Sequence, residues 1–108
     1  MSITYRLVLT SDARADLESI RNRATLEQVA SRIQLLATNP EIGKPLRGRL
    51  SGYRSIRAAR SRYRIVYRIV SGIITVFVVA IGLRRENERD DVYQRLVRMI
   101  ANGVETDI

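Results

Sequence analysis

Arginine and tyrosine are the residue types in this sequence whose spacing best suits chemistry. The stretch Tyr53–Tyr67 reads YRSIRAARSRYRIVY, in which arginines alternate with tyrosines and β-branched residues. Positions 42–85 hold no acidic residue but eleven basic ones: Lys44, Arg47, Arg49, Arg54, Arg57, Arg60, Arg62, Arg64, Arg68, Arg84 and Arg85. So many uncompensated cations in one block indicate a surface that binds a polyanion.

The charge of the rest of the chain shows that this excess is local. The 108 residues carry a net charge of +8, of which positions 42–85 contribute +11, positions 1–41 nothing and positions 86–108 −3. Histidine and cysteine are both absent, which excludes the commonest general base, thiolate nucleophiles and zinc ligation by either residue. Any reaction must therefore use arginine, Lys44, tyrosine, hydroxyls or carboxylates, and we expect no metal and no other cofactor.

An acidic group follows the basic block and has two interpretations. Glu86, Glu88, Asp90 and Asp91 offer oxygen ligands of the kind that magnesium prefers. Asp90 and Asp91 also precede an apolar helical pattern, where the helix dipole favours an anion. We favour the second interpretation, a solvated helix start.

Hydrophobic periodicity predicts the elements that position these residues. Ile3–Leu9 is typical of a strand, and Thr10-Ser11-Asp12 of a helix start. Thr25 and Gln28 fit a capping box for a second helix, which Asn39-Pro40 ends. The two helices are expected to form an antiparallel hairpin whose apolar faces pack on a sheet.

Three strands and a final helix are predicted after the hairpin. The strands are Tyr53–Ala59, Arg62–Val70 and a central Ile73–Ile81 that Gly82 ends, with residues 46–50 as a strand start or an extended arm. Ser71-Gly72 is the expected hairpin turn, and the helix runs from Val92 to near Asn102-Gly103. The prediction is one α+β domain, residues 1–108: N-terminal strand, helical hairpin, three-strand antiparallel meander and short C-terminal helix.

Alternation along Arg62–Val70 predicts the direction of its side chains. If Tyr63, Ile65 and Tyr67 face the core beneath the helical hairpin, Arg64 and Arg68 point to the opposite face. That face is expected to be partly open. A single β-bulge in this strand would reverse the assignment.

The order of elements and three local motifs resemble the RelE/ParE superfamily of toxins from bacterial type II toxin–antitoxin systems. The motifs span about half of the chain in the family's order: Lys44-Pro45-Leu46-Arg47-Gly48, then Tyr53-Arg54 through Tyr63-Arg64-Ile65-Val66-Tyr67-Arg68, then Ile81-Gly82-Leu83-Arg84 with Val92-Tyr93. The resemblance is closer to the RelE branch, whose members are metal-independent endoribonucleases that cut mRNA in the ribosomal A site.

The resemblance implies a set of site residues. Arg64, Arg84 and Tyr93 correspond to the branch's catalytic positions, and Arg54 and Arg57 to basic residues, often lysines, on the preceding strand. Further phosphate-binding residues are expected at Arg47, Lys44 and Arg85.

The chemistry implied by the resemblance is attack of the 2′-hydroxyl on the adjacent phosphorus. It leaves a cyclic phosphate and a 5′-hydroxyl, so the protein must align the groups, stabilise phosphorane charge and move two protons. Arg64 and Arg84 would hold the scissile phosphate, and Tyr93 would transfer a proton or stack on the base. Because arginine does not readily act as a base, that role falls to Tyr93, a phosphate oxygen or Lys44.

Partners and alternatives also follow from the resemblance. A cognate antitoxin would cover the basic face with an acidic helical segment, and the targets would be the ribosome and mRNA. A ParE-like, non-catalytic inhibitor of DNA gyrase and a non-cleaving RNA-binding module remain alternatives, although Arg84 and Tyr93 favour the nuclease. With no signal peptide and no apolar run long enough to span a bilayer, the protein is expected to be cytoplasmic, without membrane contact.

Overall fold

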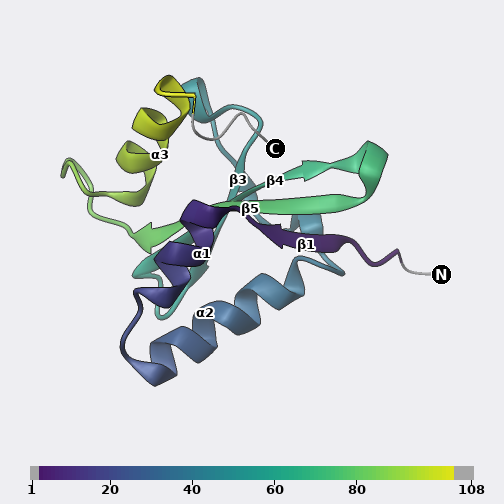
Figure 1. Ribbon diagram of the computed structural model, residues 1–108, viewed down its shortest axis with the longest axis horizontal. Helices are drawn as coiled ribbons and strands as arrows, with labels where there is room; N and C mark the ends of the chain where they lie inside the picture. The colour runs from purple at the N-terminus through teal and green to yellow at the C-terminus, as the bar shows by residue number, and fades with distance from the viewer. Residues whose placement is uncertain (1–2, 104–108) are drawn as a thin grey trace.

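The most apolar segment of the chain forms the strand around which the fold is built. Thr75–Leu83 is β5, and its residues from Thr75 to Ile81 are all buried. β5 pairs in parallel with β1 (Arg6–Leu9) and antiparallel with β4 (Tyr63–Val70). It is thus an interior strand with a neighbour on each side and buried residues on both faces, as the sequence predicts. The computed structural model describes residues 3–103 of the chain (Figure 1).

The sheet has five strands in the order β1-β5-β4-β3-β2. β3 (Arg54–Ala58) and the short β2 (Lys44–Pro45) extend it through antiparallel pairs. The predicted meander is confirmed as β3, β4 and β5. Residues 46–50 were expected to be extended, but Gly48–Leu50 forms a 3₁₀ turn after the chain reverses at Gly48, whose φ is +64°.

The hairpin helices cover one face of the sheet (Figure 1). α1 (Ser11–Glu18) starts at Thr10, whose hydroxyl accepts from the Ala13 N–H at 3.2 Å. The capping box predicted at Thr25 is wrong: α2 (Arg23–Leu35) starts at Asn22, whose side chain accepts from the Thr25 N–H at 2.9 Å. Asparagine is among the best N-cap residues. For this reason α2 begins earlier in the chain than the predicted start at Thr25.

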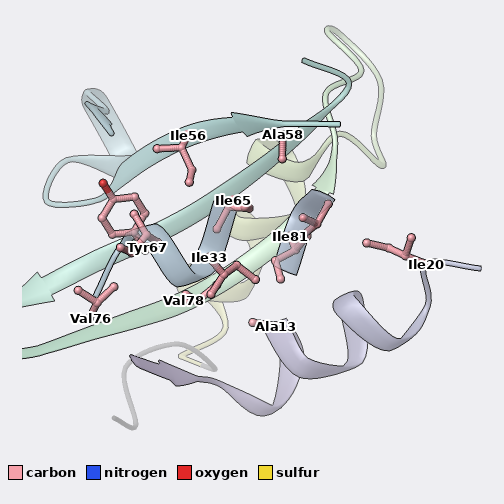
Figure 2. Packing of buried hydrophobic residues seen from close by; sticks show 12 residues of the cluster. Ala13, Ile20, Ile33, Ile56, Ala58, Ile65, Tyr67, Val76, Val78 and Ile81 are labelled. Atoms are coloured by element: carbon pink, nitrogen blue, oxygen red, sulfur yellow. The ribbon is translucent and has the colours of Figure 1, made fainter. Parts of the chain in front are cut away.

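Hydrophobic cores lie on both faces of the sheet. The core under the hairpin joins α1 and α2 to the sheet (Figure 2) and includes Ala13, Val29, Ile33, Ile65, Tyr67 and Val78. The second core joins the sheet to α3 (Val92–Ala101) and includes Val66, Phe77, Val79, Ala80, Val92 and Leu96. α3 therefore covers part of the face that was expected to be partly open, because its first and fifth residues are apolar and pack on β5.

A β-bulge in β5 keeps the alternation of β4 intact. Val66 pairs with Ala80 and Tyr67 with Val78, so Val79 is the extra residue. Because the bulge lies in β5, Ile65 and Tyr67 stay in the hairpin core. The Arg68 guanidinium lies on the other face, 5.1 Å from the centre of the Phe77 ring. The predicted direction of the tyrosine–isoleucine side is confirmed.

The turn before β5 differs from the predicted two-residue hairpin. Ser71–Ile73 forms a 3₁₀ turn, and Ile74 is left-handed with a φ of +49°. β5 accordingly starts at Thr75 instead of Ile73, and it continues through Gly82 to Leu83. Within residues 3–103, no helix is both long and apolar enough to cross a membrane.

Candidate active site

Asp91 organises the start of α3. Its carboxylate accepts hydrogen bonds from Arg84 Nη1 at 2.7 Å and from the backbone N–H of Arg85 at 2.6 Å. It also caps the helix by accepting from the N–H groups of Tyr93 at 3.0 Å and Gln94 at 3.4 Å. This position was expected to be a solvated helix start, but the Asp91 side chain is only 1% exposed.

The ionisation of Asp91 reflects competing effects. Burial opposes the charged form and by itself raises the pKa of Asp91. Hydrogen bonds from the Arg84 guanidinium and the Arg85 N–H, with the positive charge of Arg84, outweigh burial and hold the pKa below its ordinary value. Asp91 is therefore an ionised carboxylate that ties residues 84–85 to the first turn of α3.

Arg84 and Tyr93 lie against each other beside this carboxylate. The Arg84 Cζ atom is 4.7 Å from the centre of the Tyr93 ring, within the range of a cation–π contact. The Tyr93 hydroxyl lies 2.8 Å from the Ser55 hydroxyl on β3. Ser55 is itself only 7% exposed. The ring is thus held by its helix, by Arg84 and by Ser55.

The sheet register places basic residues on the same face as this group. Ser55 pairs with Lys44 on one side and with Val66 on the other, and Val66 belongs to the core beneath α3. Arg57 lies two residues after Ser55 on β3, hence on the same face, and pairs with Arg64. Because directly opposite residues in paired strands point to the same face, Lys44, Arg57 and Arg64 all share the face of Ser55 and α3.

Arg64 is held at the β3–β4 turn. Its Nη1 donates to the carbonyl oxygens of Ser61 at 2.6 Å and Tyr63 at 3.2 Å. The turn is unusual, since three successive non-glycine residues, Ala59, Arg60 and Ser61, have φ values of +51°, +58° and +66°. Both bonds use Nη1, so the other side of the guanidinium fork still offers donors to a phosphate.

In the described part of the chain, residues 3–103, the guanidinium groups of the remaining predicted site residues form no hydrogen bond or ion pair with this group. Arg54 pairs with Tyr67 and so belongs to the opposite face, where its Nη1 donates to the Gly43 carbonyl at 2.8 Å. Arg47 is exposed before the 3₁₀ turn. Arg85 is exposed and forms ion pairs with Glu88 at 3.3 Å and with Asp90 at 3.7 Å.

Ser55 and Asp91 are site residues that sequence reasoning missed. Ser55 lies two positions before Arg57, so alternation along β3 was the available signal that these two residues share a face and that Arg54 does not. Asp91 was placed correctly at a helix start, but its burial and its contact with Arg84 depend on the packing of α3.

The assembled group suits phosphate chemistry. Lys44, Arg57, Arg64 and Arg84 supply positive charge on one face, and Tyr93, whose ring lies against Arg84, supplies a hydroxyl oriented by Ser55. Within residues 3–103, no three His, Cys, Asp or Glu side chains gather into a candidate metal site.

Comparisons with known proteins identify the family of this chain. A family model described as the ParE toxin of type II toxin–antitoxin systems matches residues 7–88. Toxin RelG of Mycobacterium tuberculosis is 35% identical over 92 residues, covering 84% of this chain and 98% of the relative. Toxin RelE of the same organism is 34% identical over 86 residues, covering 79% and 87%.

A solved structure supports the same assignment. The RelBE2 toxin–antitoxin complex of Mycobacterium tuberculosis matches with 33% identity and a TM-score of 0.65, over 76% of this chain and 93% of the solved one. The chain therefore belongs to the RelE/ParE superfamily of toxins from type II toxin–antitoxin systems.

Proposed function

We propose that this toxin is a ribosome-dependent mRNA endonuclease that cleaves RNA through the 2′-hydroxyl without a metal ion. The observation that carries the proposal is the contact of Tyr93 with Arg84 and Ser55 on the face lined by Lys44, Arg57 and Arg64. A hydroxyl held in place beside a permanent positive charge is what such a reaction requires.

The arginines stabilise charge on the scissile phosphate. As the 2′-oxygen bonds to phosphorus and the bond to the 5′-oxygen breaks, negative charge grows on the non-bridging oxygens. Arg64 and Arg84 bind these oxygens, and neither loses its proton at neutral pH. Asp91 keeps the Arg84 guanidinium in place throughout the reaction. Arg57, opposite Arg64, binds the same or a flanking phosphate.

Proton transfer falls to groups around Tyr93. One proton must leave the 2′-hydroxyl, and one must reach the departing 5′-oxygen. The Tyr93 hydroxyl either donates or accepts in these steps, and Ser55 orients it. Lys44 is the only lysine in the chain and shares this face through its pairing with Ser55, so it is the second candidate for proton transfer.

A ParE-like inhibitor of DNA gyrase is the second candidate function. It is favoured by the family model, which describes a ParE toxin. An inhibitor that acts by binding alone has no need of a tyrosine hydroxyl oriented beside an arginine, and for this reason we rank it below the nuclease.

A cognate antitoxin is the expected partner in either case. A solved relative is a complex of toxin and antitoxin. The +11 charge of positions 42–85 favours an acidic antitoxin segment over the basic face.

Primer extension on a defined mRNA during in vitro translation tests the proposal. The wild-type toxin should produce new 5′ ends at codons in the ribosomal A site, and Arg84→Ala and Tyr93→Phe should produce far fewer. Arg14→Ala, which removes an exposed arginine of α1 outside the basic block of positions 42–85, is the matched control and should cut like the wild type. Intact mRNA together with cleaved DNA trapped on gyrase would establish the second candidate instead.

A further inference from the structure

Asp16 and Arg95 form a closed hydrogen-bonded group with the backbone N–H and carbonyl of one residue of β5, Ile81. Asp16 Oδ2 accepts from the Ile81 N–H at 3.0 Å, and Arg95 Nη2 donates to the Ile81 carbonyl at 3.1 Å. Arg95 Nη1 closes the group by donating to Asp16 Oδ1 at 3.1 Å. Asp16 lies on α1 and Arg95 on α3, so the group joins helices from opposite faces of the sheet (Figure 1).

The end of β1 explains why side chains are needed at this position. β1 stops at Leu9, which pairs with Val78, and the next bond to β5 is from the Thr10 N–H to the Val78 carbonyl at 3.0 Å. Beyond that point, no strand within residues 3–103 neighbours β5 on this edge. Buried backbone groups need hydrogen-bond partners, and the Asp16–Arg95 pair supplies them for the Ile81 N–H and carbonyl in place of a strand.

Gly82 leaves room for this group. A Cβ atom at position 82 would lie 2.5 Å from Arg95 Nη2 and 3.2 Å from Val92 Cβ. A side chain here would therefore push α3 and the Arg95 guanidinium away from β5. The close approach accounts for the glycine in the Ile81-Gly82-Leu83-Arg84 motif without any special backbone angle.

The group lies within one helical turn of the candidate active site. Arg95 is two residues after Tyr93 and four after the helix cap Asp91. The two sides of the first turn of α3 are thus anchored separately: Asp91 and Tyr93 to Arg84 and Ser55, and Arg95 to β5 and α1. A shift of Arg95 moves the helix backbone that carries Tyr93.

We propose that Asp16 and Arg95 are positioning residues for the Tyr93 hydroxyl, acting from the opposite side of α3. This role rests on the proposed nuclease function, although the placement of Tyr93 can be measured without it. Among residues 3–103, the Asp16 carboxylate forms no hydrogen bond or ion pair with Tyr93 or with the basic residues of the candidate site, so its effect must pass through Arg95 and α3.

Tyrosine ring NMR tests the placement independently of cleavage. In protein carrying ¹³C-labelled tyrosine, the Tyr93 signal is assigned by its loss in Tyr93→Phe. Asp16→Asn and Arg95→Lys should shift this signal in the direction produced by Ser55→Ala, because all three loosen the ring from Ser55. Glu18→Gln removes an exposed carboxylate from the same helix α1 and should leave the signal unchanged.

Single-turnover cleavage on programmed ribosomes tests the functional consequence. Asp16→Asn should lower the cleavage rate at saturating toxin about 10-fold, since small misplacements of a catalytic group are costly. The toxin concentration for half-maximal rate should change less than about 2-fold, because the phosphate-binding residues Arg57 and Arg64 lie on β3 and β4, and Arg84 is held by Asp91. In a Tyr93→Phe background, Asp16→Asn should cause little further loss, since both changes affect the same hydroxyl.

The outcomes separate the two proposals. An unchanged Tyr93 signal in folded Asp16→Asn and Arg95→Lys refutes the positioning role, as does a rate loss that is fully additive with Tyr93→Phe. If the wild type cuts no mRNA, the nuclease proposal fails while the NMR result still decides whether the group positions Tyr93. Thermal unfolding of each variant establishes that the compared proteins are folded.

Discussion

Replacing Asp91 should reveal how much one buried carboxylate contributes to the fold. Asp91→Ala removes the helix cap, worth about 1 kcal/mol, and leaves Arg84 and the Arg85 N–H without their acceptor. Breaking a fully buried ion pair costs about 3–5 kcal/mol, but Arg84 is 27% exposed and regains water. We take about 2 kcal/mol for this part, within the range for hydrogen bonds to charged groups, and expect a total loss of about 3 kcal/mol in the free energy of unfolding.

Two further variants separate these contributions. Asparagine is as good a helix cap as aspartate, so Asp91→Asn should keep the cap and lose only the contacts with Arg84 and the Arg85 N–H, about 2 kcal/mol. Asp90→Ala is the matched control: its carboxylate is exposed and pairs with Arg85 only at 3.7 Å, so its loss should stay within about 0.5 kcal/mol.

The pH dependence of stability tests the role of the Asp91 carboxylate independently. The folded-state pKa of Asp91 is lowered, so its contribution is present above the ordinary carboxyl pKa and is lost as the pH falls through the lowered value. The stability difference between wild type and Asp91→Asn should therefore be full at neutral pH and shrink in acid. The measurement is urea unfolding of the four proteins from pH 7 downward. A loss below about 1 kcal/mol for Asp91→Ala, or a difference that grows in acid, would refute the role assigned to the carboxylate.

Three other results are expected. Tyr67→Phe should lower the free energy of unfolding by about 1–3 kcal/mol in urea titrations, because the buried hydroxyl accepts from one backbone N–H at 2.8 Å and donates to a carbonyl at 2.7 Å. Arg64→Gln should reduce the slope of log affinity for RNA against log salt concentration by about one phosphate contact, measured by fluorescence anisotropy; an unchanged slope would place Arg64 outside the interface. Ser55→Ala should slow single-turnover mRNA cleavage while RNA affinity stays the same, since it frees the Tyr93 hydroxyl without removing a cation; equal loss of both would contradict an orienting role.

Local patterns determined the elements and the charged face. Alternation along residues 62–70 predicted that Ile65 and Tyr67 face the hairpin core, and the structure confirms it because strand side chains alternate regardless of partner. The excess of cations between positions 42 and 85 is likewise a property of the sequence alone. The family motifs supplied Arg64, Arg84 and Tyr93, whose catalytic roles remain predictions.

Register and long-range packing were decided only by the tertiary structure. Alternation places Ser55 and Arg57 on one face of β3, but strand pairing decides whether that face lies toward α3 or toward the hairpin core, and a one-residue shift would exchange the two. Both Asn22 and Thr25 are polar residues able to cap α2, and the structure uses Asn22 instead of the predicted Thr25.

The contacts around Tyr93 were the least accessible to sequence reasoning. Ser55 and Tyr93 are 38 positions apart, and Asp16 and Arg95 are 79 apart. No local periodicity encodes such pairs, because they form only when α3 packs on β5. The sequence thus determined which side chains were available for chemistry, and the packing of α3 determined which of them meet.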